Sequence, residues 1–120
     1  MERKHRLTRS IDFKRVRRMG RSLAHPLAVL ISLRNDLALT RLGVSAAKSI
    51  GSAVQRNRAK RRLREVLHSH WPKIASGWDV ILIARPGAVD AEWDLLQSAI
   101  NGLLQRSDLL RESNRDERTS

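Results

Sequence analysis

Apolar residues recur along this chain with a helical spacing in three segments and with shorter periods in the segments between them. The first helical segment is 11–19, which has Ser10 as a candidate N-cap and ends at Gly20. Its apolar positions are Ile11, Phe13 and Val16. The pattern predicts a short N-terminal helix.

Two strand-like runs follow this helix. LAVLISL (27–33) is apolar at nearly every position, which is typical of a buried strand, and LALTRLGVS (37–45) alternates as a half-buried strand does. The RND sequence at 34–36 favours a turn between them. We therefore expect the two runs to form a β-hairpin.

The longest helical segment begins after Gly51 and should run to about Ser69, just before a Trp-Pro pair. Ser52 and Gln55 have the spacing of a capping box at its start. One face of this helix contains Ala59, Leu63, Val66, Leu67 and His70. This face is expected to lie against the sheet.

The last part of the chain predicts one more strand and one more helix. DVILIAR (79–85) is a short run rich in β-branched residues that indicates a central strand, and Pro86-Gly87 ends it. Asp90 is expected to cap the final helix. The apolar stripe of that helix is Leu96, Ile100, Leu103 and Leu104. The element order indicates an α+β domain, in which 37–45 connects to 79–85 through the long helix as a βαβ crossover.

Composition limits the classes of protein and of site. The chain has 120 residues, of which 41% are hydrophobic and 3% aromatic, so it suits one domain with an aliphatic core. It contains no cysteine, which excludes disulfides, thiolate zinc sites and cysteine nucleophiles. No apolar run approaches the length of a membrane span, and no apolar segment of a secretory signal follows the basic N-terminus. A cytoplasmic protein without membrane contact is expected.

Charge is the strongest indication of function. Lys and Arg number 24 and Asp and Glu 12, which gives a net charge of +12 at pH 7. Self-repulsion of this size is usually relieved by a polyanion, and the excess of Arg over Lys suits bidentate contacts with phosphate. One cationic block occupies 3–21 and a second occupies 56–64. Residues 106–120 alternate in sign instead, and they are expected to be a flexible tail.

The second cationic block lies on the predicted long helix. Six of its nine residues are cationic, namely Arg56, Arg58, Lys60, Arg61, Arg62 and Arg64. Like charges at i, i+4 spacing cost a few tenths of a kcal/mol each, and cations in the first turns oppose the helix dipole. A solvated basic face is the alternative, but this density of charge favours a nucleic-acid surface. RNA is favoured over DNA because the α+β domain has no helix-turn-helix pattern.

The stretch GVSAAKSIGSAVQRNRAKRRLREVL (43–67) resembles the signature of the protein subunit of bacterial ribonuclease P. The matching residues are Gly43, Val44, Ser45, Lys48, Gly51, Ala53, Val54, Arg56, Asn57, Arg58, Lys60 and Arg61. RLTRSIDFKRVRRMG (6–20) resembles the opening helix of that family, and DVILIAR (79–85) resembles its following strand.

This resemblance implies one α+β domain over 1–105. It implies a four-stranded sheet and three helices in the order αβββαβα, similar to the second domain of ribosomal protein S5. It also implies an unusual left-handed βαβ crossover, whereas general rules favour a right-handed one.

In that family the RNA subunit is the catalyst, and it uses Mg²⁺ to cut precursor tRNA and release the 5′ leader. The protein binds the RNA subunit and holds the leader. The resemblance therefore implies a non-catalytic accessory subunit of an endoribonuclease, monomeric, with one copy per RNA and with no cofactor assigned to the protein alone. The sequence agrees, because no set of His, Asp and Ser or of paired acids has a recognisable catalytic spacing.

The resemblance assigns RNA contacts in three sets. Residues expected to face the RNA subunit are Arg56, Asn57, Arg58, Arg61 and Arg62. Residues expected to contact the leader are Phe13, Arg17, Ile31, Ser45, Lys48, Lys60 and Arg64. Further basic contacts are expected from Arg3, Lys4, Arg6, Arg9 and Lys14.

Some of these assignments have alternatives. The leader cleft of the family lies between the first helix and the sheet, where aromatic side chains stack on single-stranded bases. Phe13 matches one such position, with core packing as its alternative. Arg17 and Ile31 stand where relatives often have aromatic residues, and Arg17 is a candidate substitute because Arg can stack and also bind phosphate. The tryptophans are expected to pack in the core or at its rim, at positions Trp71, Trp78 and Trp93.

Two other functions stay open. A ribosomal or other structural RNA-binding protein would share the charge and the small α+β body. A nuclease with its own active site would cut precursor tRNA without an RNA subunit.

Overall fold

In the computed structural model the described part of the chain is residues 5–110, so the predicted contacts of Arg3 and Lys4 and most of the predicted tail lie outside it. The helices and strands are α1 (Ser10–Met19), β1 (Arg21–Ala24), β2 (Ala28–Arg34), β3 (Arg41–Ala46), α2 (Ala53–His70), β4 (Trp78–Ala84) and α3 (Trp93–Arg106). Two 3₁₀ turns, η2 (Trp71–Lys73) and η3 (Pro86–Ala88), follow α2 and β4. These elements confirm the predicted α+β class with three helices and one four-stranded sheet.

The strand order in the sheet is β1-β2-β4-β3, so the predicted hairpin between 27–33 and 37–45 is wrong. β4 lies between β2 and β3, antiparallel to β2 and parallel to β3. The physical reason is the composition of β4. Its central residues 79–82 are all buried, because both faces of this strand are covered, and such a strand lies inside a sheet and not at its edge. The hydrophobic pattern alone did not identify β1, because its four residues, RSLA, are mostly exposed and carry no apolar period, whereas the order implied by the resemblance includes this strand.

β3, α2 and β4 form the expected βαβ unit, since the two strands pair in parallel from Arg41↔Asp79 to Ala46↔Ala84. α2 spans the distance between them across one face of the sheet and contacts both strands. The crossover itself is thus confirmed, and its hand stays a prediction.

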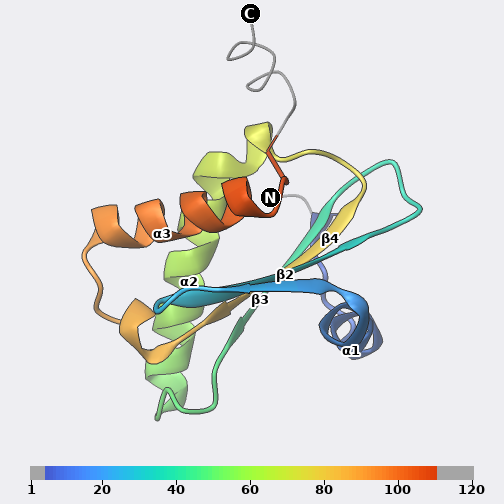
Figure 1. Cartoon of the computed structure of the whole chain (residues 1–120). Coiled ribbons are helices and arrows are strands. Elements are labelled where there is room, and N and C mark those ends of the chain that lie inside the picture. The colour runs from blue at the N-terminus through green and yellow to red at the C-terminus, as the bar shows by residue number, and fades with distance from the viewer. Residues whose placement is uncertain (1–4, 111–120) are drawn as a thin grey trace, which may run out of the picture.

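The helices cover the two faces of the sheet unequally (Figure 1). α2 and α3 pack on one face, against side chains such as Leu30 and Leu82. α1 packs on the other face, where Val16 contacts a smaller cluster that contains Ile31 and Ile81. Val29 and Ile83 on this face are only half-buried, so this face is less completely covered than the first.

Two of the predicted N-caps are wrong and one is confirmed. The Oγ of Ser52 accepts a hydrogen bond from the backbone N–H of Gln55 at 3.2 Å, as expected. Ser10 is instead the first residue of α1, whose N-cap Arg9 makes no side-chain bond. Asp90 precedes the start of α3, because the chain still turns there and the N–H of Ala91 donates to the carbonyl of Gly87.

Most of the predicted apolar faces are confirmed. The stripe on α3 is buried at Leu96, Ile100, Leu103 and Leu104. Ile11 does not belong to the inner face of α1, since it is 66% exposed. Trp71 and Trp78 pack at the rim of the main core, as expected, and Trp93 is more exposed. Among residues 5–110 no helix is both long enough and apolar enough to cross a membrane.

Candidate nucleic-acid interface

α2 separates apolar and cationic residues onto different faces. Its inner residues Ala59, Leu63, Val66 and Leu67 are at most 1% exposed and lie against the sheet and α3. Lys60 is half-buried and Arg61 and Arg64 are exposed. The cations therefore occupy the outer side and the flanks of a helix whose position is fixed by its core.

A groove of about 620 Å³ runs between α2, the outer edge of β3 and the segment that leads into α1. Its apolar lining consists of Leu7, Phe13, Leu42, Gly43, Val44 and Leu67. Its polar lining consists of Arg6, Thr8, Arg61, Arg64, Glu65 and His68. The groove thus combines an aromatic ring and an apolar floor with three guanidinium groups.

The ring of Phe13 lies directly on Gly43 in β3. A Cβ atom at Gly43 would be 2.5 Å from Phe13 Cζ and 3.0 Å from the carbonyl oxygen of Leu7, which is closer than such atoms pack. The ring is half-buried, packs against the cluster beneath α1 and also lines the groove. Phe13 therefore has a packed edge and an open surface, so the two interpretations of it are compatible.

The other residues predicted at the leader are spread over the structure. Ile31 is 7% exposed beneath α1, so it offers almost no surface to RNA. Ser45 is half-buried on the same face of the sheet as Gly43, and Arg17 and Lys48 are exposed. Of the predicted leader-binding set, the groove brings together Phe13 and Arg64, and it adds Arg6 and Arg61 from the other two sets.

The cations predicted to face the RNA subunit have unequal freedom. Asn57 and Arg61 are exposed, and within residues 5–110 their side chains bond to no other residue. Arg56 is half-buried. Arg58 and Arg62 donate hydrogen bonds to backbone carbonyls of the segment between β4 and α3, with Arg58 Nε 3.1 Å from the Val89 oxygen.

A buried ion cluster on the α1 side of the sheet was not predicted. Asp79 in β4 is fully buried, and its carboxylate accepts hydrogen bonds from Arg41 at 2.9 and 2.8 Å, from Arg15 at 2.6 Å and from Asn35 at 2.9 Å. Asp12 of α1 lies 3.5 Å from Arg15 and 3.7 Å from Arg41. The only signal in the sequence was a single carboxylate at the start of an apolar strand.

The charge state of this cluster follows from its contacts. Burial alone would raise the pKa of Asp79, but the hydrogen bonds from Arg41 and Asn35 and the charge of Arg15 hold that pKa below its usual value. The same hydrogen bond raises the pKa of Arg41. The cluster therefore stays ionised at neutral pH and fastens α1, through Arg15, to the centre of the sheet.

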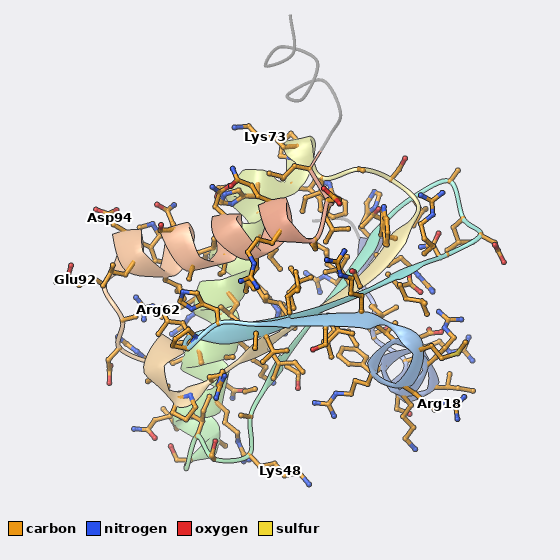
Figure 2. The ribbon with its side chains drawn as sticks, viewed as in Figure 1. Arg18, Lys48, Arg62, Lys73, Glu92 and Asp94 are labelled. Atoms are coloured by element: carbon orange, nitrogen blue, oxygen red, sulfur yellow. The ribbon has the colours of Figure 1, made fainter. Side chains whose placement is uncertain are left out.

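The basic surface extends beyond the groove. Arg9, Lys14 and Arg18 are exposed on and before α1, and Figure 2 shows Arg18 pointing away from the sheet. Within the described part of the chain, no group of three or more His, Asp and Glu side chains is arranged to hold a metal ion.

Comparison with known proteins gives one consistent result. The family model for ribonuclease P matches residues 1–108. The chain is 43% identical over 109 residues to a ribonuclease P protein component of Herpetosiphon aurantiacus, covering 91% of this chain and 89% of that one. A ribonuclease P protein component of Symbiobacterium thermophilum is 38% identical over 111 residues, covering 92% and 96%.

Solved structures agree with the sequence relatives. The RNase P protein of Staphylococcus aureus superposes with a TM-score of 0.79 at 31% identity, over 89% of this chain and 98% of that one. The RNase P protein of Thermotoga maritima gives a TM-score of 0.75 at 27% identity, over 84% and 96%. With the family model covering nearly the whole described region, the chain belongs to the ribonuclease P protein family.

Proposed function

We propose that this chain is the protein subunit of ribonuclease P and that it binds both the RNA subunit and the 5′ leader of precursor tRNA. Membership of the family supports the general role, which is tRNA processing as part of an endoribonuclease. The observation that carries the finer role is the groove, where Phe13 lies beside Arg6, Arg61 and Arg64. An aromatic ring with flanking guanidinium groups is the combination that binds single-stranded nucleic acid.

The groove and the outer side of α2 have different tasks in this proposal. In the groove, a leader base stacks on the open surface of Phe13 while Arg64 neutralises a neighbouring phosphate. Arg61, which lines the groove and is also exposed on α2, reaches the RNA subunit beside the leader. On the outer side of α2, the amide of Asn57 can bond a ribose hydroxyl of the RNA subunit. One helix thereby holds the catalyst and the substrate close together.

Catalysis belongs to the RNA subunit, which uses Mg²⁺ to activate water. The protein acts by binding: it raises the local concentration of the leader and neutralises phosphates that would otherwise need extra divalent cations. One protein monomer per RNA suffices for this role.

Reconstitution tests the proposal. The purified chain is added to a bacterial ribonuclease P RNA, and cleavage of precursor tRNA is measured at low Mg²⁺ with and without the protein. We expect the protein to increase cleavage strongly under these conditions and to cut nothing without the RNA. Unchanged cleavage would exclude the proposed role, and cleavage by the protein alone would indicate a nuclease with its own active site.

A further inference from the structure

The side chain of Arg62 is already occupied within the protein. Its Nη1 donates hydrogen bonds to the carbonyl oxygens of Ala88 at 2.8 Å and Val89 at 3.0 Å, and its Nη2 donates to that of Ala91. All three acceptors belong to the segment that joins β4 to α3, and Figure 2 shows Arg62 beside this segment. One guanidinium group thus donates hydrogen bonds to three carbonyl oxygens of a single connecting segment.

Without Arg62, only one of these carbonyls, that of Val89, would keep a hydrogen-bond donor among the described residues, which is Arg58. Ala88 and Val89 are buried, and they lie at the end of η3, where the last carbonyls of a helical turn have no partner within the turn. An Arg fork can serve several acceptors at once, whereas a Lys ammonium is a compact point charge. The ring of Trp93 lies 6.0 Å from Arg62 Cζ and restricts access to the guanidinium further.

The surroundings of Arg62 also disfavour phosphate. The exposed acids Asp90, Glu92 and Asp94 follow the same turn, and Asp90 lies 3.9 Å from Arg58. Arg61, the preceding residue in the chain, has the opposite environment, since it is exposed and lines the groove.

We infer that Arg62 is a positioning residue that fastens the 88–91 segment, and with it the start of α3, to α2, and that it does not contact RNA. The cationic residues of α2 then divide by task. Arg62 has a structural role. Arg58 has a structural role as well as its predicted RNA contact, because its Nε donates a hydrogen bond to the Val89 carbonyl. The RNA-binding surface is the side of α2 that carries Arg61 and Arg64. The RNA half of this inference rests on the proposed function, and the structural half does not.

Paired substitutions at adjacent arginines test it. The test compares Arg62→Met and Arg62→Lys with Arg61→Met and Arg61→Lys, all in the full chain. Two properties are measured: the thermal unfolding of the free protein, and the salt dependence of its binding to a bacterial ribonuclease P RNA. Both Arg62 variants should lower Tm by about 5 °C or more and leave the slope of log affinity against log salt unchanged. Arg61→Met should reduce that slope by about one and leave Tm almost unchanged, and Arg61→Lys should preserve both.

The Lys variants separate the two roles of an arginine. A phosphate contact is rescued by Lys because the charge is kept, whereas the three-carbonyl contact is not. The inference is overturned if Arg62→Met reduces the salt slope while Arg62→Lys restores it at unchanged Tm. If Arg62→Met is too unstable to purify, Arg62→Lys still decides through faster hydrogen exchange at the Ala91 amide, which bonds to Gly87. If no variant changes the slope, the proposed RNA surface is wrong, and Tm alone decides the structural role of Arg62.

Discussion

Asp79 and Arg41 are direct cross-strand partners at the junction of β4 and β3, and they form a bidentate ion pair with distances of 2.9 and 2.8 Å. Arg15 of α1 bonds to the same carboxylate. This single carboxylate therefore joins α1 to two parallel strands of the sheet. Because Phe13 is on that helix, the geometry of the groove depends on the ion cluster.

The first prediction concerns Asp79→Asn. Removing one partner from a buried pair leaves the other charges uncompensated, so the free energy of unfolding at pH 7 should fall by about 3 kcal/mol. The pKa of Asp79 is lowered by folding, so its contribution is present above the unfolded pKa of about 3.9 and is lost as pH falls through the lower folded pKa. Urea unfolding followed by circular dichroism at several pH values measures this.

The difference between the wild type and Asp79→Asn should thus shrink below about pH 4. Asp36→Asn is the matched control, because Asp36 is exposed in the loop between β2 and β3. An equal loss of stability at pH 7 and at pH 2 would contradict the assigned ionisation.

The second prediction concerns the contact between Phe13 and Gly43. Gly43→Ala should displace the ring, since the new Cβ would lie 2.5 Å from Phe13 Cζ, and should lower the free energy of unfolding by about 1–3 kcal/mol. Gly102→Ala in α3 is the control, because nothing lies within 4 Å of its Cβ position and Ala favours the helix by about 0.5–1 kcal/mol. Chemical denaturation measures both variants.

A double-mutant cycle locates the origin of that cost. When Phe13→Ala is already present, Gly43→Ala should cost clearly less, because the clashing ring is gone. Additive effects would show that the carbonyl of Leu7, 3.0 Å from the same position, sets the cost instead.

The helices and central strands could be predicted because their information is local. The stripes of α2 and α3 and the apolar run of β4 each repeat with a period that one element alone determines. The pairing of strands is not local: 27–33 and 37–45 are adjacent in sequence, yet β4, which is apolar except for Asp79, is inserted between β2 and β3. The caps at Ser10 and Asp90 failed because the start of a helix depends on the turn before it.

The sequence predicted the region of the candidate site, but it did not predict which cations of that region are free to bind RNA and which support the fold. Charge density identified α2, but nothing in the sequence distinguishes Arg61 from Arg62. Only Arg62 donates hydrogen bonds to the carbonyls of a turn that lies more than 25 residues away in the chain. Asp79 was missed for the same reason, since its partners Arg15 and Arg41 are distant in the chain. Contacts between distant segments decide which of many similar side chains are free to bind.

The third prediction tests base stacking. Phe13→Ala should weaken binding of leader-bearing precursor tRNA to the reconstituted enzyme by about tenfold, because a stacked base contributes about 1–3 kcal/mol, and should hardly affect mature tRNA. Ile11→Ala on the same helix is the control, since Ile11 is 66% exposed and lies outside the groove. An equal loss for both tRNAs would assign Phe13 to packing alone.

The fourth prediction tests the division between groove and outer helix. Arg64→Gln should weaken the binding of precursor tRNA more than that of the RNA subunit, because Arg64 lines the groove, and should lower the salt dependence of precursor binding by about one phosphate contact. Arg106→Gln removes an equal charge from α3, outside the groove, and should change neither binding constant beyond a small general effect. Filter binding over a range of salt concentrations measures both. If Arg64→Gln and Arg106→Gln weaken precursor binding equally, net charge and not the groove attracts the leader. The role given to Arg64 would then be wrong, and the role of Phe13 would depend on the stacking test alone.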